Sequence, residues 1–275
     1  MYKFQRRYTG PIQAVIMDMA GTCMDFGSMA PIRAFQALFA DAGVPVTEAE
    51  ARRPMGMEKR DHILALLAEP RVHQAWLAQY GEVASVTQVD QLYSDFVVHQ
   101  QRAIAETSDL IQGVTTLLDF CAEQQIGVGL NTGYSREMIE ELLPLLAEQG
   151  LTPRSLVSAS DVPIGRPSPW MCLQNAQDLG VSCVQACIKV DDTAVGIEEG
   201  LNAGMWTVAV AVSGNQTGLT LAQWQALTSD EQTRLSAKAR QALACSGAHY
   251  VIDTVAQLPE VILEINRRLA MEENP

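Results

Sequence analysis

An apolar segment near the N-terminus, residues 14–18, ends in a carboxylate, Asp18, and a turn follows at Gly21. A short apolar run bounded by a turn is typical of a strand that a parallel sheet buries on both faces. Open sheets of this kind bind ligands at the carboxyl ends of their strands. An isolated Asp before Gly often serves only as a turn former or helix cap, so Asp18 needs support from other strand ends before it counts as functional.

Further strand patterns occur at residues 127–130, 155–158, 186–190, 206–212 and 250–252, and helical patterns separate them. This alternation predicts an α/β fold with a doubly wound parallel sheet. Between Thr22 and Thr107 the apolar residues recur only at helical spacing, and residues 47–50 form a capping box. We therefore expect a helical cap domain, residues 27–106, inserted after the first strand of a core domain that comprises residues 1–26 and 107–275.

The composition limits the partners that this chain can have. Its 275 residues carry a formal net charge of −13, which disfavours nucleic acid and anionic membranes as partners. Its six cysteines form no CxxC pair, so we expect reduced thiols in a cytoplasmic protein. Residues 1–10 lack an apolar segment of the signal-peptide kind, and the longest apolar run, residues 206–212, is too short to cross a membrane.

Polar residues stand at several predicted strand ends besides Asp18. They are Thr132, Arg166 on a loop, and the adjacent pair Asp191 and Asp192. The carboxyl ends of parallel strands meet at one edge, so these side chains are expected to lie together. Asp18 and one of the later aspartates can bind Mg²⁺ with a backbone carbonyl such as that of Ala20, and Thr132 can donate a hydrogen bond to a phosphoryl oxygen.

The segment Asp18-Met19-Ala20-Gly21-Thr22 resembles the first motif of the haloacid dehalogenase superfamily, Asp-x-Asp-Gly-Thr. In that superfamily the first Asp attacks phosphorus, and the second is the general acid and base for the leaving group. Ala20 takes the second position here and cannot transfer a proton. The superfamily's later lysine is also missing. Lys189 lies within a strand and is expected to point away, so Arg166 is its expected replacement, because a guanidinium binds phosphoryl oxygens as a planar fork.

The segment from Met55 to His62 places Lys59 and His62 three residues apart, on one face of a helix. Either residue alone is more often structural than catalytic. Together with the alanine of the first motif, they make the chain similar to the phosphonoacetaldehyde hydrolases, the phosphonatase branch of the superfamily. The matching stretches are residues 18–22, 53–62, 132–138, 161–167 and 203–208, and the similarity covers nearly the whole chain after Pro11.

This resemblance implies a Rossmann-like core of the haloacid dehalogenase type and hydrolysis of phosphonoacetaldehyde to acetaldehyde and phosphate, in 2-aminoethylphosphonate degradation. It makes Asp18 the nucleophile and Lys59 the Schiff-base lysine. It assigns Mg²⁺ to Asp18, the Ala20 carbonyl and Asp192, although Asp191 remains an alternative ligand. The remaining residues expected to line the active site are Met55, His62 and Tyr134 near the catalytic groups, and Gly56, Thr132, Gly133 and Arg166 around the substrate. A homodimer through the cap is implied as well.

The chemistry of these residues agrees with the resemblance. Breaking a carbon–phosphorus bond expels a carbanion, and an iminium on Lys59 would accept those electrons and leave a neutral enamine. Lys59 must be partly neutral for this, with its pKa lowered from about 10.4 to about 7–8. Burial and nearby cations would lower this pKa. Glu58 would raise it if it faced Lys59, so Glu58 is expected to face out.

Position 196 is Gly, where the superfamily's fourth motif often has a second Asp, and Asp191 can take over that role.

Two other functions remain open from the sequence. One is a phosphatase of the same superfamily that acts on a small phosphate monoester, against which Ala20 and Lys59 argue. The other is a catalytically inactive binding protein, against which the retained Asp18 argues.

Overall fold

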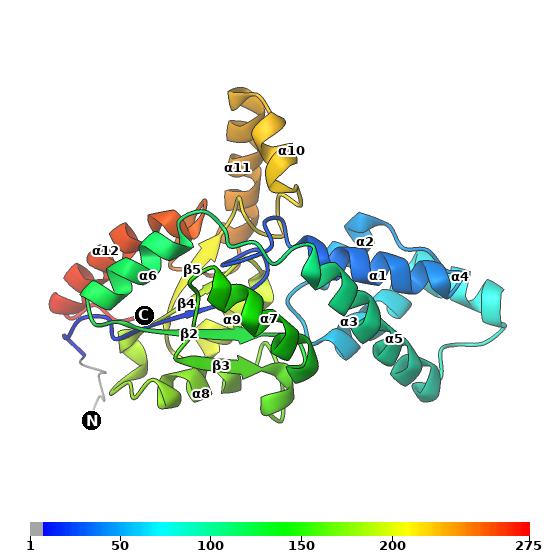
Figure 1. Cartoon of the computed structure of the whole chain (residues 1–275), viewed down its shortest axis with the longest axis horizontal. Helices are drawn as coiled ribbons and strands as arrows, with labels where there is room; N and C mark the ends of the chain where they lie inside the picture. The colour runs from blue at the N-terminus through cyan, green and yellow to red at the C-terminus, as the bar shows by residue number, and fades with distance from the viewer. Residues whose placement is uncertain (1–7) are drawn as a thin grey trace, which may run out of the picture.

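The computed structural model describes residues 8–275, and its centre is a six-stranded parallel sheet (Figure 1). The strands lie in the order β3-β2-β1-β4-β5-β6. Their bounds are β1 Ala14–Met17, β2 Gly127–Thr132, β3 Ser155–Ser158, β4 Cys187–Asp191, β5 Trp206–Val210 and β6 Tyr250–Ile252. The predicted doubly wound parallel sheet is therefore confirmed. The expectation about residues 1–10 falls mostly on residues 1–7, which lie outside the described part of the chain.

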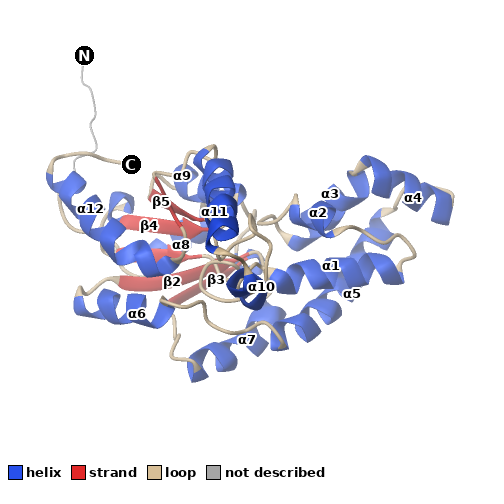
Figure 2. Cartoon of the chain, turned by 90° about the horizontal axis from the view of Figure 1, so that it is seen from above, coloured by secondary structure: helices blue, strands red, loops and turns tan. Residues whose placement is uncertain are grey.

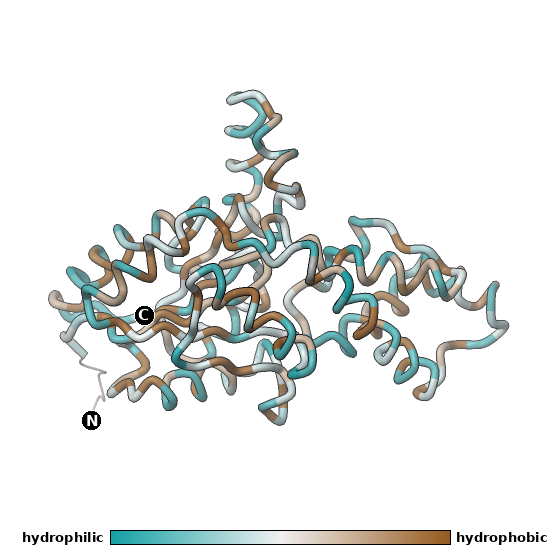
Figure 3. The backbone as a smooth tube through the Cα atoms, viewed as in Figure 1, coloured by the Kyte–Doolittle hydropathy of each residue, from teal (hydrophilic) through white to brown (hydrophobic). Residues whose placement is uncertain are grey.

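Side chains of β1 alternate between two apolar clusters, one on each face of the sheet. Val15 and Met17 belong to the larger cluster, while Ala14 and Ile16 belong to a smaller one beneath α8. Helices α6 and α12 cover the first face, and α8, α9 and α11 cover the second. In Figure 3 the helices α6 and α12 alternate between hydrophobic and hydrophilic stretches, as amphipathic helices on a sheet do.

The helices of this core are α6 Val114–Glu123, α7 Arg136–Glu148, α8 Trp170–Asp178, α9 Ala194–Asn202, α10 Leu221–Ala226, α11 Ser229–Ala244 and α12 Leu258–Ala270. Helices α10 and α11 form an arm that extends from the sheet (Figure 1). Short 3₁₀ turns occur at Ala159–Asp161, Val184–Ala186 and Val255–Gln257. Within residues 8–275, no helix is both long and apolar enough to cross a membrane.

Five helices between β1 and α6 form a cluster beside the sheet (Figure 2). They are α1 Met29–Asp41, α2 Glu48–Arg52, α3 Lys59–Ala68, α4 Pro70–Tyr80 and α5 Val86–Ala105. Inside this cluster the ring of Phe35 stacks on Phe96 at 4.3 Å and on His62 at 3.9 Å. The predicted capping box is present, with Thr47 and Glu50 bonded to each other's backbone N–H. The division into two domains at residues 26/27 and 106/107 stays a prediction.

Two strands run further than the apolar pattern suggested. β2 continues to Thr132, which pairs with Ser158, and β4 continues to Asp191, which pairs with Ala209. The apolar pattern stops at the first polar side chain, whereas the backbone hydrogen bonds continue beyond it. These polar residues therefore belong to the strands, and their positions are fixed by the sheet.

Ile16 is fully buried in the central strand, so truncating it should leave a cavity. We expect Ile16→Ala to lower the free energy of unfolding by about 3 kcal/mol, measured by urea denaturation. The control is Val98→Ala on α5, where the side chain is 47% exposed and the expected change is within about 0.5 kcal/mol. Equal stability of the two variants would contradict the assignment of β1 to the core.

Candidate active site

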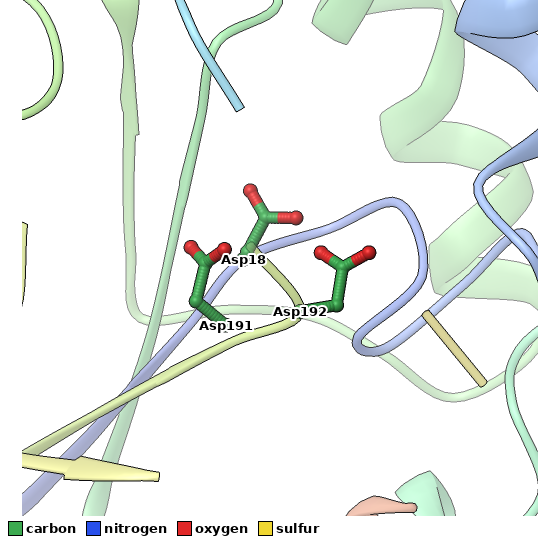
Figure 4. A group of neighbouring side chains, drawn as sticks. All are labelled: Asp18, Asp191 and Asp192. Atoms are coloured by element: carbon green, nitrogen blue, oxygen red, sulfur yellow. The ribbon is translucent and has the colours of Figure 1, made fainter. Parts of the chain in front are cut away.

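Three aspartates meet at the carboxyl edge of the sheet (Figure 4). Asp18 follows β1 and donates its N–H to the carbonyl of Val190 at 2.9 Å. Asp191 ends β4, and Asp192 comes next. All three are buried, and one carboxylate oxygen from each lies within 4.8 Å of the others. The sheet thus gathers the carboxylates that the sequence predicted at its strand ends.

Both carboxylate oxygens of Asp191 contact the protein, Oδ1 through hydrogen bonds and Oδ2 through ion pairs alone. Oδ1 accepts hydrogen bonds from the N–H of Thr193 at 3.0 Å and its hydroxyl at 2.7 Å. Oδ2 lies 3.1 Å from Lys189 Nζ and 3.4 Å from Arg166 Nη1. These contacts hold the side chain in place and compensate its charge.

Asp192 differs, because only one of its oxygens is engaged. Oδ2 accepts the N–H of Asn215 at 2.6 Å, but Oδ1 is buried without a hydrogen-bond partner. Burial, Asp18 and Asp191 together raise the pKa of Asp192 well above its usual value. Burial likewise raises the pKa of Asp18, against the opposing effect of Arg166. A buried unpartnered carboxylate oxygen facing like charges fits a divalent cation with oxygen ligands, so the donor set suits Mg²⁺.

Arg166 brings positive charge to Asp18. Its Nη2 donates to Asp18 Oδ1 at 2.8 Å, and its Nε donates to Glu199 Oε2 at 2.9 Å. Burial disfavours the charged guanidinium, but Asp191, Asp18 and Glu199 outweigh it and raise the Arg166 pKa. The predicted cation is therefore present beside Asp18.

The expectation that Lys189 points away from the site is wrong. Its side chain is fully buried, and Nζ lies 3.1 Å from Asp191 Oδ2 and 3.1 Å from Glu199 Oε2, with a further bond to Asn131 Oδ1. Burial and Arg166 oppose its charge, yet Glu199 and Asp191 raise its pKa. The sequence pattern of a strand shows that side chains alternate between its two faces. It does not show that α9 brings Glu199 to the face of β4 that carries Lys189.

The loop before α3 closes the site from the cap. Gly56 adopts φ +94°, and a Cβ there would lie 2.4 Å from Thr193 Oγ1. On the other side, a Cβ at Gly133 would lie 3.0 Å from the carbonyl oxygen of Met57. Neither Gly56 nor Gly133 has room for a larger side chain. Glycine at these positions therefore allows the loop before α3 to contact the core loops directly.

Lys59 is the first residue of α3 and is buried. Its Nζ lies 5.3 Å from the ring centre of Tyr134 and 5.9 Å from that of Phe35. Burial lowers its pKa from 10.5 to about 8, while Asp18 opposes the shift and Arg166 supports it. This lowering of the Lys59 pKa is in the direction expected from the sequence.

Glu58 is partly buried rather than turned to solvent, which corrects the expectation for it. Its carboxylate accepts the N–H groups of Arg60 and Asp61 and caps α3. It still raises the pKa of Lys59 to a small extent, behind burial, Asp18 and Arg166.

His62 lies one turn after Lys59 and is fully buried. Its Nε2 lies 2.9 Å from the carbonyl oxygen of Ala51, so Nε2 carries the proton, and Nδ1 has no hydrogen-bond partner. Burial and the charge of Lys59 lower the pKa of His62 well below its usual value. The ring is therefore neutral, with a free acceptor nitrogen.

A small cavity of about 20 Å³ lies between the loop before α3 and the strand ends. Every residue predicted for the site lines it except His62, whose ring stacks on that of Phe35. Its lining is Asp18, Ala20, Ser28, Pro31, Met55, Gly56, Met57, Lys59, Thr132, Gly133, Tyr134, Arg166, Asp192 and Thr193.

Sequence reasoning missed Ser28, whose hydroxyl lies 3.4 Å from the Ala20 carbonyl oxygen, and the charge partner Glu199. A polar residue within an apolar helical pattern was the available signal for Glu199.

Known proteins share both the sequence and the fold of this chain. The family model that describes haloacid dehalogenase-like hydrolases matches residues 12–204 of this chain. A phosphonoacetaldehyde hydrolase of Hahella chejuensis is 51% identical over 100% of this chain and 93% of its own length. Another, from Paraburkholderia xenovorans, is 46% identical over 96% of this chain and 99% of its own.

The structural comparisons agree. A phosphonoacetaldehyde hydrolase-like protein from Oleispira antarctica is 49% identical, covers 100% of both chains and has a TM-score of 0.97. A β-phosphoglucomutase from Clostridium difficile, 20% identical, covers 94% of this chain and 99% of its own with a TM-score of 0.68, and it shows the shared fold alone. The chain is therefore a hydrolase of the haloacid dehalogenase-like family and belongs to its phosphonoacetaldehyde hydrolase branch.

Proposed function

We propose that this protein hydrolyses the carbon–phosphorus bond of phosphonoacetaldehyde through an imine on Lys59 and a phosphorylated Asp18. The observation that carries the proposal is that a buried lysine, with a pKa of about 8, lines the same small cavity as a buried aspartate. Ala20 supports it, because a phosphatase would need a proton donor at that position. The names of the relatives support the same substrate.

The first step concerns Lys59. Its neutral amine attacks the aldehyde carbon, the former carbonyl oxygen takes up one proton from the amine and one from solvent, and loss of water leaves a protonated imine. One oxygen of Asp18 then attacks phosphorus while the carbon–phosphorus bond breaks, and the bonding pair moves into the C=N⁺ group to form an enamine. Protonation of the enamine carbon and hydrolysis of the imine release acetaldehyde and free Lys59. Water attacks the aspartyl phosphate and releases phosphate, which restores Asp18.

The surrounding residues have separable tasks in this scheme. Arg166 and Thr132 bind phosphoryl oxygens, and Arg166 also holds Asp18 in line. The free Nδ1 of His62 accepts protons during imine formation on the same face of α3. Asp18, Asp192 and the Ala20 carbonyl would hold Mg²⁺, which would supply positive charge next to the phosphoryl group.

We place the reaction in 2-aminoethylphosphonate degradation, on the basis of the family resemblance. The six free cysteines are consistent with a reducing, cytoplasmic compartment. The resemblance also supports a homodimer formed through the cap.

Trapping the imine tests the function directly. Incubation with phosphonoacetaldehyde and Mg²⁺, followed by borohydride, should leave a two-carbon adduct on Lys59, one of only four lysines in the chain. Lys59→Arg keeps the charge but cannot form an imine, so we expect turnover to fall by about 10³-fold or more with folding retained. Lys238→Arg, on the exposed face of α11, is the matched control. Near-normal turnover by Lys59→Arg would exclude the imine, and phosphate release from simple esters without an adduct would favour a phosphatase.

The lowered pKa of Lys59 predicts a specific pH profile. Reductive alkylation of Lys59 with acetaldehyde and cyanoborohydride should rise about tenfold between pH 7 and pH 9 and then level off, because the amine is half neutral near pH 8. Peptide mapping measures the rate, with exposed Lys238 as the surface reference. A Lys59 rate that still climbs steeply above pH 9 would contradict the shift.

Replacing Asp192 should change the stability of the protein differently with and without Mg²⁺. At about 100 times its dissociation constant, Mg²⁺ should stabilise the wild type by about 2.7 kcal/mol. Asp192→Asn should lose this gain and the Mg²⁺-dependent turnover, yet be no less stable in EDTA, because the substitution removes like-charge repulsion. Asp178→Asn, an exposed carboxylate on α8, is the control. Undiminished Mg²⁺ stabilisation of Asp192→Asn would show that the ion binds elsewhere.

A further inference from the structure

Gly196, in the first turn of α9, has no room for a side chain. A Cβ placed there would lie 2.0 Å from Cγ of Asp191 and 2.0 and 2.2 Å from its two carboxylate oxygens. The φ of Gly196 is not positive, so backbone conformation does not demand glycine here. The carboxylate of Asp191 therefore occupies the space that a side chain at position 196 would fill.

The Asp191 carboxylate joins two buried cations in that space. Its Oδ2 contacts Lys189 and the Nη1 atom of Arg166, and Thr193 fixes Oδ1. Glu199 contacts the same two cations, at 2.9 Å from Arg166 Nε and 3.1 Å from Lys189 Nζ. Arg166 is thus held at Nε and Nη1, which directs its Nη2 to Oδ1 of Asp18.

We propose that Asp191 is a positioning residue that supplies, from the end of β4, the carboxylate that position 196 lacks. It orients the guanidinium of Arg166 toward the nucleophile and the phosphoryl group. This role rests on the proposed phosphoryl transfer to Asp18, and it assigns the cation to Asp192 rather than to Asp191. Asp191 acts through Arg166 and does not touch the reacting atoms.

The alternative is that Asp191 is itself a metal ligand, since one of its oxygens lies within 4.8 Å of oxygens of Asp18 and Asp192. Its engaged oxygens argue against this, because a ligand oxygen would have to leave Lys189 and Arg166 or Thr193. Asp191 Oδ2 and Asp192 Oδ1 both lack a hydrogen-bond partner, but Asp191 Oδ2 is paired with the charges of Lys189 and Arg166, whereas Asp192 Oδ1 has no cation beside it among the described residues. The two roles predict different effects of removing Asp191. A positioning role weakens the affinity for phosphate, whereas a ligand role weakens the affinity for Mg²⁺.

The test moves the carboxylate from one position to the other. Four variants are compared with the wild type: Asp191→Gly, Gly196→Asp, the double swap, and Asp178→Asn as a surface-charge control. The carboxylate of Gly196→Asp would lie in the first turn of α9, where negative charge is favourable. Calorimetry measures the affinities for Mg²⁺ and, with Mg²⁺ present, for inorganic phosphate. Turnover and borohydride trapping of acetaldehyde on Lys59 complete the set.

For Asp191→Gly we expect phosphate affinity to fall about tenfold and kcat about 100-fold, because a charge-assisted anchor of Arg166 is lost. Its Mg²⁺ affinity should stay within about threefold of the wild type, and trapping on Lys59 should be unchanged. Gly196→Asp alone should fold poorly or be inactive, because two carboxylates would overlap. The double swap should recover phosphate affinity to within about threefold of the wild type, which a merely structural Asp191 would not explain.

Three results would overturn the proposal. They are a loss of Mg²⁺ affinity of about 100-fold in Asp191→Gly, unchanged phosphate affinity in that variant, or a folded double swap no better than Asp191→Gly. Should Asp191→Gly not fold, Asp191→Asn keeps the shape and allows the same comparison. Phosphate binding does not require phosphonoacetaldehyde to be the substrate. An inactive wild type would therefore refute the proposed function while the phosphate affinities still decide the role of Asp191.

Discussion

The site depends on a buried charge balance at the carboxyl edge of the sheet. Two cations, Arg166 and Lys189, are buried there against four carboxylates, Asp18, Asp191, Asp192 and Glu199. Counting these six as charged, and Lys59 as neutral in the way the proposed imine requires, leaves two negative charges, which a divalent cation would neutralise. Burial makes an uncompensated charge costly, so this excess explains why the pKa values of Asp18 and Asp192 rise without a metal.

The same burial acts in opposite directions on two lysines. Lys189 has two carboxylates at 3.1 Å, so its pKa rises and it stays charged. Lys59 faces the rings of Tyr134 and Phe35 at more than 5 Å, and no carboxylate pairs with it directly among the described residues, so burial lowers its pKa. One lysine is thus a structural cation and the other the proposed nucleophile, and their immediate neighbours make the difference.

The sequence predicted the parallel sheet, the strand-end residues and the cap lysine, because periodicity and residue type determine these locally. It did not predict the direction of Lys189, which depends on α9 bringing Glu199 to the same face of β4. Nor did it predict that Glu58 would cap α3 instead of facing solvent. The sequence suggested that Asp191 could replace a carboxylate at position 196, but not that the Asp191 carboxylate lies in the space beside Gly196.

The size of the cavity places the chemistry in one state of the molecule. About 20 Å³ holds roughly one water molecule, so a substrate with a phosphonyl group requires the cap to open for entry. Opening would separate Gly56 from Thr193 and expose Lys59 to water, which removes the burial that lowers its pKa. In the proposed reaction, closure would therefore do more than exclude water, because it would also favour the neutral amine. Capture of the aldehyde and transfer of the phosphoryl group would then both belong to the closed state, in which Lys59 and Asp18 share a single cavity.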